Sequence, residues 1–484
     1  MKLRSFVPVC VPGILGIVCL SLSTGCQSKS NGNAASKNEV EKLTTANKSL
    51  TAENARLKKQ LEAAKKSSSE TSKSDNHSEE LQALKAQLEL KQLEKEWLAA
   101  RILKMRGGRI KGDKKGYVIA VDLSESDASD EDLDVLASFS RLSELTLDGP
   151  AFTADCTKHL VDLSSLKVLG LKNTGVNDDS LKHLEDLTTL TSLDLFRTDI
   201  RGEGLKHLRK MNQLRNLDLR RTRVNNAGLA HLKDLKSLRA IRLQETSIDD
   251  DGLAHLTGLP NLAALNLIGT NIGDNACTHI AKMKAMRGLD FDLTNVTSAG
   301  LEALKELKQL SSLSLRNAPS IDDSAMEAIK EFAALRRLLL SATAVGNDGL
   351  EHLKSLKNLE YLDLRETAVT DDGLKHLAEM KSLNRLSLWS TEVSSEGLAH
   401  LKGLTNLVRL NCDTTQVGDE GLAHLKGLTK LEYLNLNSTQ VTDKGLAHLA
   451  GLKNLKELQL SFSQVTDEGV KTLQKALPNC KIIR

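Results

Sequence analysis

The stretch Leu431–Asn454, LEYLNLNSTQVTDKGLAHLAGLKN, decides the fold because it returns in the same frame along most of the chain. The next copy begins at Leu455 and the previous one at Leu407, each 24 residues away. Fifteen such units begin between Val118 and Leu455, and a further closing strand is expected over 480–483. A fixed period of this length is the signature of a solenoid of stacked repeats.

Each unit contains one expected strand and one expected helix. The motif L-x-x-L-x-L, as in Leu431, Leu434 and Leu436, predicts a short strand with one buried face. Leucines at spacings of three, as in Leu446 and Leu449, predict a short helix. Because one unit cannot bury its own leucines, neighbouring units must stack on one another.

Two polar positions recur at the turn between strand and helix. The ninth position is threonine in eleven units, as in Thr439, and a hydroxyl there is expected to satisfy loop backbone groups. The thirteenth position, as in Asp443, is Asp, Asn or Ser and is predicted to be the helix N-cap. Glycine follows two residues later in most units, which indicates a close approach between neighbouring coils.

This repeated frame resembles the leucine-rich repeat, in particular the cysteine-containing subclass found beside F-boxes and the threonine variant common in bacterial proteins. The family's Asn or Cys at the ninth position is Thr here. The resemblance covers 118–484 and implies an α/β fold. It implies a curved solenoid with a parallel sheet on the concave face and short helices on the convex face. The resemblance also suggests a ubiquitin-ligase adaptor, but the sequence shows no F-box, and an export signal disfavours that role.

The start of the chain predicts export to the cell envelope. Residues 1–25 read as a signal peptide, with Lys2 and Arg4 before an apolar run that is too short and broken for a stable membrane span. The run ends Leu22-Ser23-Thr24-Gly25-Cys26, similar to a bacterial lipoprotein signal. That similarity implies a lipid on Cys26 and a location on the outer membrane or cell surface. Plain secretion and an uncleaved anchor are the alternatives.

Helical segments are expected between this signal and the repeats. Residues 26–37 form a tether, and 38–66 carry a heptad pattern in which Asn47 and Asn54 occupy one seam. This pattern predicts a coiled coil that could form a homodimer, or else a single solvated helix. A Ser-rich linker follows over 67–78. Residues 79–117 are expected to form an amphipathic helix and an N-terminal cap, with Trp97 and Ile102 covering the first repeat.

Nothing in the sequence predicts an enzyme, a cofactor or a metal site. A formal charge of +3 gives no indication of nucleic-acid binding. Eleven of the twelve histidines recur at the eighteenth position of a repeat, where a structural role flanking the core is favoured over a metal column. No phosphate loop, zinc-type cysteine pair or nucleophile elbow is present in the sequence. The cysteines at 156, 277, 412 and 480 lie in different repeats and are expected as core filler.

Binding is expected on the concave face, where the residues vary from repeat to repeat. Residues next to and between the strand leucines face the open side of the sheet. Aromatic and arginine side chains there are the types that dominate interfaces. The candidate ligand-binding residues are Phe196, Arg220, Arg242, Arg316, Tyr361, Asp363, Arg365, Arg385, Trp389, Arg409 and Tyr433.

Two functions fit these features. The first is a recognition module at the envelope that binds a protein or peptide on its concave face. The second is a structural spacer between membrane and wall, whose coiled coil oligomerises. The sequence does not name the ligand.

Overall fold

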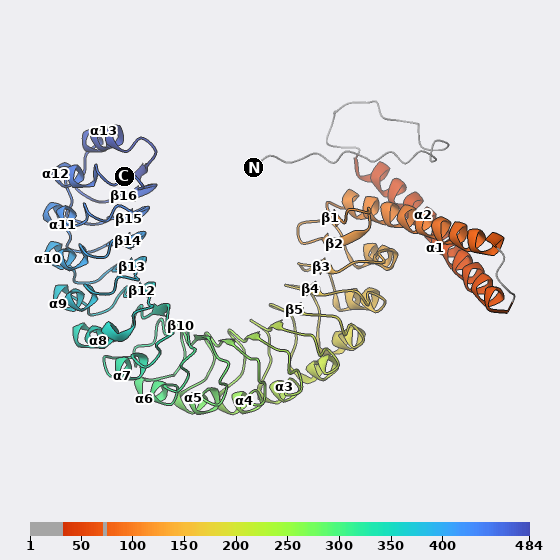
Figure 1. Cartoon of the computed structure of the whole chain (residues 1–484), viewed down its shortest axis with the longest axis horizontal. Helices are drawn as coiled ribbons and strands as arrows, with labels where there is room; N and C mark the ends of the chain where they lie inside the picture. The colour runs from red at the N-terminus through yellow and green to blue at the C-terminus, as the bar shows by residue number, and fades with distance from the viewer. Residues whose placement is uncertain (1–31, 71–74) are drawn as a thin grey trace.

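The structure, a computed structural model, describes residues 32–70 and 75–484. It is an open arc in which short strands line the inner side and short helices cover the outer side, so the predicted solenoid is confirmed (Figure 1). Two long helices extend from the N-terminal arm of the arc (Figure 1). The predicted signal peptide and Cys26 lie outside the described residues. Within the described ranges no helix combines the length and apolarity needed to cross a membrane.

In the described part of the chain, 17 strands form one sheet that follows the chain from one end of the arc to the other. The first pair, β1 and β2, is antiparallel, and every later neighbour is parallel and one repeat away. The strand β17 is the predicted closing strand. The strands are β1 (Arg109–Gly112), β2 (Val118–Asp122), β3 (Glu144–Thr146), β4 (Val168–Gly170), β5 (Ser192–Asp194), β6 (Asn216–Asp218), β7 (Ala240–Arg242), β8 (Ala264–Asn266), β9 (Gly288–Asp290), β10 (Ser312–Ser314), β11 (Arg337–Leu339), β12 (Tyr361–Asp363), β13 (Arg385–Ser387), β14 (Arg409–Asn411), β15 (Tyr433–Asn435), β16 (Glu457–Gln459) and β17 (Lys481–Ile483).

The helices of the arc are short, and the first repeats contain 3₁₀ turns in place of α-helix. The α-helices are α1 (Gly32–Glu70), α2 (Asp75–Met105), α3 (Asn226–Ala230), α4 (Asp250–Ala254), α5 (Asp274–Ile280), α6 (Ser298–Glu302), α7 (Ala325–Ile329), α8 (Asn347–His352), α9 (Asp371–Leu374), α10 (Ser395–Leu398), α11 (Asp419–Ala423), α12 (Asp443–Leu446) and α13 (Asp467–Ala476). The 3₁₀ helices are η1 (Asp130–Ser138), η2 (Ala154–Leu160), η3 (Asp178–Leu184), η4 (Glu203–Leu208), η5 (Leu353–Ser355), η6 (Lys375–Leu377), η7 (Ala399–Leu401) and η8 (Ala447–Leu449).

The core is a continuous stack of leucines between the sheet and the helices. In the repeat that begins at Leu431, the strand residues Leu434 and Leu436 and the helix residue Leu449 are fully buried. Burying one such side chain contributes about 1.5–3 kcal/mol. Cys412 replaces a strand leucine and is also buried, and burial raises the pKa of its thiol to about 12. The four cysteines of the described chain are free and buried, as the predicted filler role requires.

The threonine column stabilises the turn after each strand. Thr439 Oγ1 donates to the Leu436 carbonyl oxygen at 2.6 Å, and the residue between them in the turn, Ser438, has left-handed backbone with φ 52°. Buried backbone carbonyls need hydrogen-bond partners, and in several repeats the threonine amide also donates to this oxygen, as Thr198 N does to the Leu195 carbonyl oxygen at 3.3 Å. The same bond to the third residue back is made by Thr174, Thr198, Thr222, Thr246, Thr270, Thr294, Thr343, Thr367, Thr391, Thr415 and Thr439.

The predicted N-caps are wrong by one residue. The cap of α12 is Thr442, whose Oγ1 accepts from Lys444 N, and Asp443 is the first residue of the helix. The Asp443 carboxylate crosses to the next repeat, where it accepts from Thr466 N at 2.7 Å and from Thr466 Oγ1 at 2.6 Å. These hydrogen bonds lower the pKa of Asp443. The thirteenth position therefore joins neighbouring coils.

The recurring glycine makes room for that joint. A Cβ added at Gly469 would lie 2.0 Å from Asp443 Oδ1, and one at Gly397 would lie 2.1 Å from Asp371 Oδ1. Asp371 makes the corresponding bonds to Ser394 N and Oγ, at 2.8 Å and 2.5 Å. A larger residue at the glycine would displace the carboxylate that holds the two coils in register.

The helices α1 and α2 form an antiparallel hairpin within one chain. Leu50 and Leu57 from the predicted seam are buried, and Asn47 Nδ2 donates to the Lys95 carbonyl at 2.9 Å. Asn54 Nδ2 lies 3.4 Å from the Lys91 carbonyl oxygen. The heptad seam predicted over 38–66 is thus covered by α2 of the same chain, and both seam asparagines bond to α2 backbone.

The hairpin docks on the first repeat through Glu96, and the predicted role of Trp97 is wrong. Glu96 is fully buried and accepts from Val118 N at 2.8 Å, Ser140 N at 2.9 Å and Ser140 Oγ at 2.7 Å. Trp97, one residue on, faces away and is 56% exposed. Ile102 is buried against the core, as predicted. A buried carboxylate at the end of the solenoid thus pairs amides that would otherwise lack partners.

Candidate binding surface

The concave face presents three side-chain positions from every repeat. In the parallel register of the sheet, Tyr361 of β12, Arg385 of β13, Arg409 of β14 and Tyr433 of β15 are direct neighbours. The positions two and four residues further on lie on the same face because side chains alternate along a strand. The sheet therefore collects residues that lie far apart in sequence into rows.

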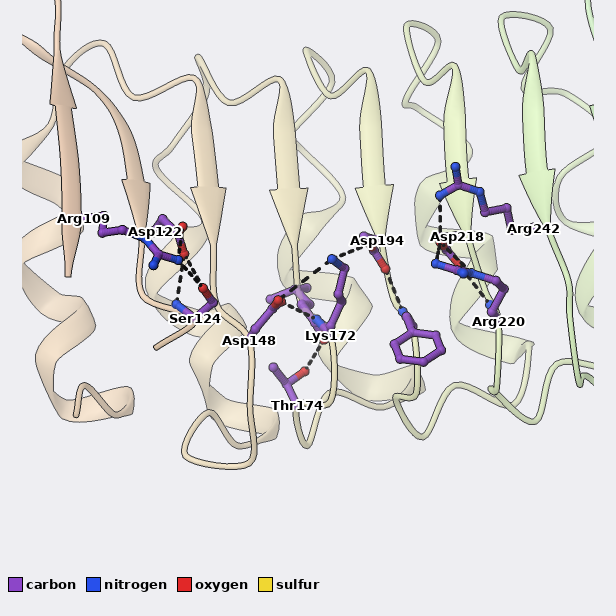
Figure 2. A network of polar contacts seen from close by, with 12 residues as sticks. Arg109, Asp122, Ser124, Asp148, Lys172, Thr174, Asp194, Asp218, Arg220 and Arg242 are labelled. Carbon is purple, nitrogen blue, oxygen red and sulfur yellow. Dashed lines mark hydrogen bonds and ion pairs between the residues drawn. The ribbon is translucent and has the colours of Figure 1, made fainter. Parts of the chain in front are cut away.

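The N-terminal half of this face is occupied by a network of ion pairs (Figure 2). Arg109 Nη2 lies 2.8 Å from Asp122 Oδ2. Lys172 stands between two carboxylates, with its Nζ 3.5 Å from Asp194 Oδ2 and 4.0 Å from Asp148 Oδ2 (Figure 2). Burial raises the pKa of both Asp148 and Asp194. The charges on this half therefore satisfy one another.

Four of the predicted ligand-binding arginines belong to such pairs. Arg220 makes a bidentate contact with the buried Asp218, with a shortest distance of 2.6 Å, and Arg242 lies 3.2 Å from the same carboxylate (Figure 2). Burial alone would raise the pKa of Asp218, but the hydrogen bonds and charge of Arg220 outweigh it and lower the pKa. The other two pairs are Arg316 with Asp292 and Arg365 with Asp363.

The pairing changes the expected role of Asp363. Its side chain is completely covered, and Arg365 Nη2 lies 2.8 Å from its Oδ2. Asp363 is therefore positioned to hold Arg365 and is not open to a ligand in this structure. The sequence contains a signal for this arrangement, because Asp218–Arg220 and Asp363–Arg365 share the spacing Asp-x-Arg along a strand.

Asp290 is a concave carboxylate outside this ion-pair network. It lies on β9 beside Asp292, and its Oδ2 accepts from Asn266 Nδ2 at 3.1 Å. Burial and the neighbouring Asp292 raise its pKa to about 6. Arg316 bonds to Asp292 and leaves Asp290 without an ion pair in the described chain.

The C-terminal half of the face is different because two of its arginines are unpaired. Arg385 and Arg409 are exposed and form no ion pair among the described residues. Together with Tyr361, Arg365 and Tyr433, they line a hollow of about 200 Å³. Five residues predicted as ligand-binding are thus brought to one place.

Two further predicted residues stand outside the hollow. Trp389 follows β13 and is half-buried on the concave side, so its indole is not sealed in the core. Phe196 lies in the N-terminal half, with the guanidinium groups of Arg220 and Arg221 5.1 Å and 5.9 Å from its ring centroid. Cation–π contacts of this kind fix the ring against the ion-pair network.

Sequence reasoning did not single out Ser387 and Asn411, which also line the hollow. Ser387 is only 8% exposed, and its hydroxyl has no hydrogen-bond partner. The sequence did predict that both residues lie on the concave face, since each stands two residues after one of the unpaired arginines on the same strand. What the sequence could not show is that the serine hydroxyl lacks a partner.

The histidine column lies on the helical side of the arc, away from this surface. Four of its members contact acidic or hydroxyl side chains of the preceding repeat, as His207 Nδ1 does with Glu185 Oε2 at 3.1 Å and His183 Nδ1 with Thr157 Oγ1 at 3.0 Å. Burial lowers the pKa of His183 and His376. No group of three or more potential metal ligands occurs among the residues searched, which are those the structure describes.

Comparisons with known proteins agree with the repeat pattern. A sequence model of the leucine-rich repeat region matches residues 314–484, and a model of the leucine-rich repeat matches residues 186–208. Among curated proteins, none is similar enough in sequence to count as a relative.

Two solved structures are similar in fold. An internalin (inlF) from Listeria monocytogenes has a TM-score of 0.51 and 22% identity, covering 63% of this chain and 88% of its own. A leucine-rich repeat protein of Leptospira interrogans has a TM-score of 0.54 and 19% identity, covering 72% of this chain and 92% of its own. At these identities the likeness shows the fold alone.

The repeats, the parallel sheet and the partial family matches together show a leucine-rich repeat fold. A domain of this class suggests a protein–protein interaction module, and the matches indicate no catalytic family.

Proposed function

We propose that this protein is a recognition module of the bacterial cell envelope, which binds a protein or peptide on the concave face of strands β11–β16. The observation that carries this proposal is the contrast between the two halves of the face. Arg220, Arg316 and Arg365 are neutralised by aspartates, whereas Arg385 and Arg409 carry unpaired charge beside half-buried tyrosines. Arginine and aromatic side chains in such a setting are typical of interface hot spots.

Envelope attachment is the second part of the proposal. The signal-like residues 1–25 and the candidate lipidation site Cys26 support it, and the repeats follow them in the chain. Replacing Cys26 by serine should move the protein from the membrane fraction to the soluble fraction of exporting cells. A Cys26→Ser variant that stays in the membrane fraction as the wild type does would refute lipid anchoring.

The alternative of an oligomeric spacer receives less support. It needs a free heptad seam, and the seam of α1 is packed against α2 of the same chain. A homodimer through 38–66 would have to open that hairpin. Sedimentation of the exported protein distinguishes the two proposals. The spacer proposal expects a dimer that dissociates when Leu50 and Leu57 are replaced by polar residues. The recognition proposal expects no such change in oligomeric state.

Affinity capture from envelope extracts tests the recognition proposal. The wild type is compared with Arg385→Ala combined with Trp389→Ala, and with a convex control, Lys357→Ala combined with Glu379→Ala, whose side chains are exposed on the opposite side of the coils. The proposal expects a partner that the wild type and the convex control retain and the concave variant loses. Equal recovery by all three proteins contradicts a concave binding face.

A further inference from the structure

The hollow across β12–β15 carries chemistry that the proposed function does not specify. Arg385 and Arg409 are register partners on adjacent parallel strands, so their backbones lie about 4.8 Å apart. Two like charges held side by side repel each other and favour a bound anion. The described chain supplies no carboxylate to either one.

The carboxylates closest to the hollow are already engaged. Asp363 is covered by Arg365. Asp413 accepts from Asn435 Nδ2 and from Thr414 Oγ1, and Glu457 accepts from Gln459 Nε2. The donors to Asp413 and Glu457 are neutral, and neither carboxylate forms an ion pair with Arg385 or Arg409, so both arginines lack a directly bonded anion in the described chain.

The floor of the hollow offers hydrogen-bond donors. Ser387 lies two residues after Arg385 on the same face of β13, and its hydroxyl is buried without a partner. Buried polar side chains are nearly always paired, so this exception points to a missing acceptor. Asn411 Oδ1 accepts from Asp413 N, which leaves its amide nitrogen as a further donor beside the serine.

The tyrosines form the walls on either side. Arg409 lies over the ring of Tyr433, with its guanidinium carbon 4.0 Å from the ring centroid, which restrains that charge. Tyr361 is the register neighbour of Arg385 on the other side. Burial raises the pKa of Tyr433, so its hydroxyl remains protonated and able to donate.

The volume indicates what kind of ligand fits. A hollow of about 200 Å³ is smaller than the sites of about 300–1,000 Å³ that enclose a whole small molecule. It suits one charged group of a larger, extended ligand. A peptide on the sheet would carry such a group past the arginines.

We propose that this hollow is an oxyanion subsite, in which Arg385, Arg409 and the Ser387 hydroxyl bind a carboxylate or phosphate group carried by a peptide on the concave face. The inference rests on the proposed peptide-binding function and specifies its ligand as acidic. Guanidinium groups recognise both oxyanions through charge-assisted hydrogen bonds.

The test uses fluorescent oligoglutamate and oligoglutamine peptides of equal length, together with a phosphoserine peptide, in anisotropy titrations against the full exported chain. We expect oligoglutamate to bind and oligoglutamine not to bind. Arg385→Gln and Arg409→Gln should each weaken oligoglutamate binding about tenfold or more. The matched control is Arg239→Gln, an exposed arginine before β7 without an ion pair in the described chain, and it should change binding less than twofold. Tighter binding of the phosphoserine peptide, with the same arginine dependence, would identify phosphate as the preferred oxyanion.

Ser387→Ala separates a ligand role from a structural one. Because the hydroxyl has no partner in the fold, its removal should leave the unfolding temperature unchanged or higher, yet weaken oligoglutamate binding several-fold. Binding that is equal for both peptides, or that Arg239→Gln weakens as much as Arg385→Gln does, overturns the subsite. The envelope partner of the capture experiment could then still depend on Trp389, so failure of the subsite and failure of the proposed function are distinguishable.

Discussion

Replacing Gly397 by alanine tests how closely neighbouring coils fit at the start of each helix. Gly397 lies inside α10 with ordinary helical backbone, so alanine is allowed by conformation. The added Cβ would lie 2.1 Å from Asp371 Oδ1 and 3.1 Å from Leu374 Cδ1. Any loss of stability must therefore come from contact with the preceding repeat.

The magnitude follows from what the carboxylate must give up. Asp371 accepts from Ser394 N at 2.8 Å and from Ser394 Oγ at 2.5 Å, and it can make room only by leaving both. Overpacking and the loss of these half-exposed bonds cost about 1–3 kcal/mol. A glycine-to-alanine change at a compatible position gains about 0.4–1 kcal/mol. The expected net loss in the free energy of unfolding is about 1–2 kcal/mol.

Gly427→Ala is the matched control, one repeat further along. No heavy atom lies within 4 Å of the Cβ added there, so the variant should be as stable as the wild type or slightly more stable. Urea unfolding followed by circular dichroism and by tryptophan fluorescence measures both variants, and the midpoint should fall for Gly397→Ala and stay or rise slightly for Gly427→Ala.

Removing the obstructing carboxylate supplies a second check. In an Asp371→Ala background, Gly397→Ala should cost less than half of what it costs alone, because the two residues are coupled through one contact. If Gly397→Ala raises the midpoint as Gly427→Ala does, or if the two substitutions add without coupling, the close fit between coils is not what positions the repeats.

Three other predictions concern the cap, the turn and the pH dependence. Glu96→Ala leaves the amides of Val118 and Ser140 without their acceptor, which costs about 1–3 kcal/mol of stability for each amide. Hydrogen exchange should therefore accelerate in α2 and β2 and not in β12–β15. Unchanged exchange in α2 would contradict this docking. Thr415→Val removes the hydrogen bond to the Cys412 carbonyl and should lower the free energy of unfolding by about 1–2 kcal/mol in thermal unfolding. Thr415→Ser keeps the hydroxyl and should cost less. Equal losses of stability would mean that the methyl group matters and the hydroxyl does not. The pKa of Asp290 is raised from 3.8 to about 6 in the folded state, so between these pH values the folded state holds a proton that the unfolded state lacks, and the free energy of unfolding falls as the pH rises. Asp290→Asn should therefore gain stability relative to the wild type between about pH 4 and pH 7. A stability difference that does not depend on pH would refute the raised pKa.

Sequence reasoning predicted the architecture because the repeat period and the buried leucines are local properties of the chain. It placed Thr439 in the turn and Leu434 in the core for the same reason. It misassigned Asp443 because the partner of that carboxylate, Thr466, lies 23 residues further along and becomes a neighbour only when the coils stack. In the hairpin, a shift of one residue along a helix turns the side chain by about 100°, which puts Glu96 inside and Trp97 outside.

The sequence predicted which residues lie on the binding surface, but not which of their charges are neutralised by neighbours. The strand alternation placed Tyr361, Arg385 and Arg409 on the open face, where the structure has them. The sequence did not show that Asp363 neutralises Arg365 or that Ser387 lacks a partner, because both facts depend on side-chain geometry.

The joint between coils has a consequence for how such a chain can vary in length. Asp371, Asp419 and Asp443 each bond to the following coil in the same way, so these junctions share one connector. A coil can be duplicated or lost without redesigning the ones that flank it. The span of the arc can thus change by whole coils, while the residues available to contact a partner are set coil by coil.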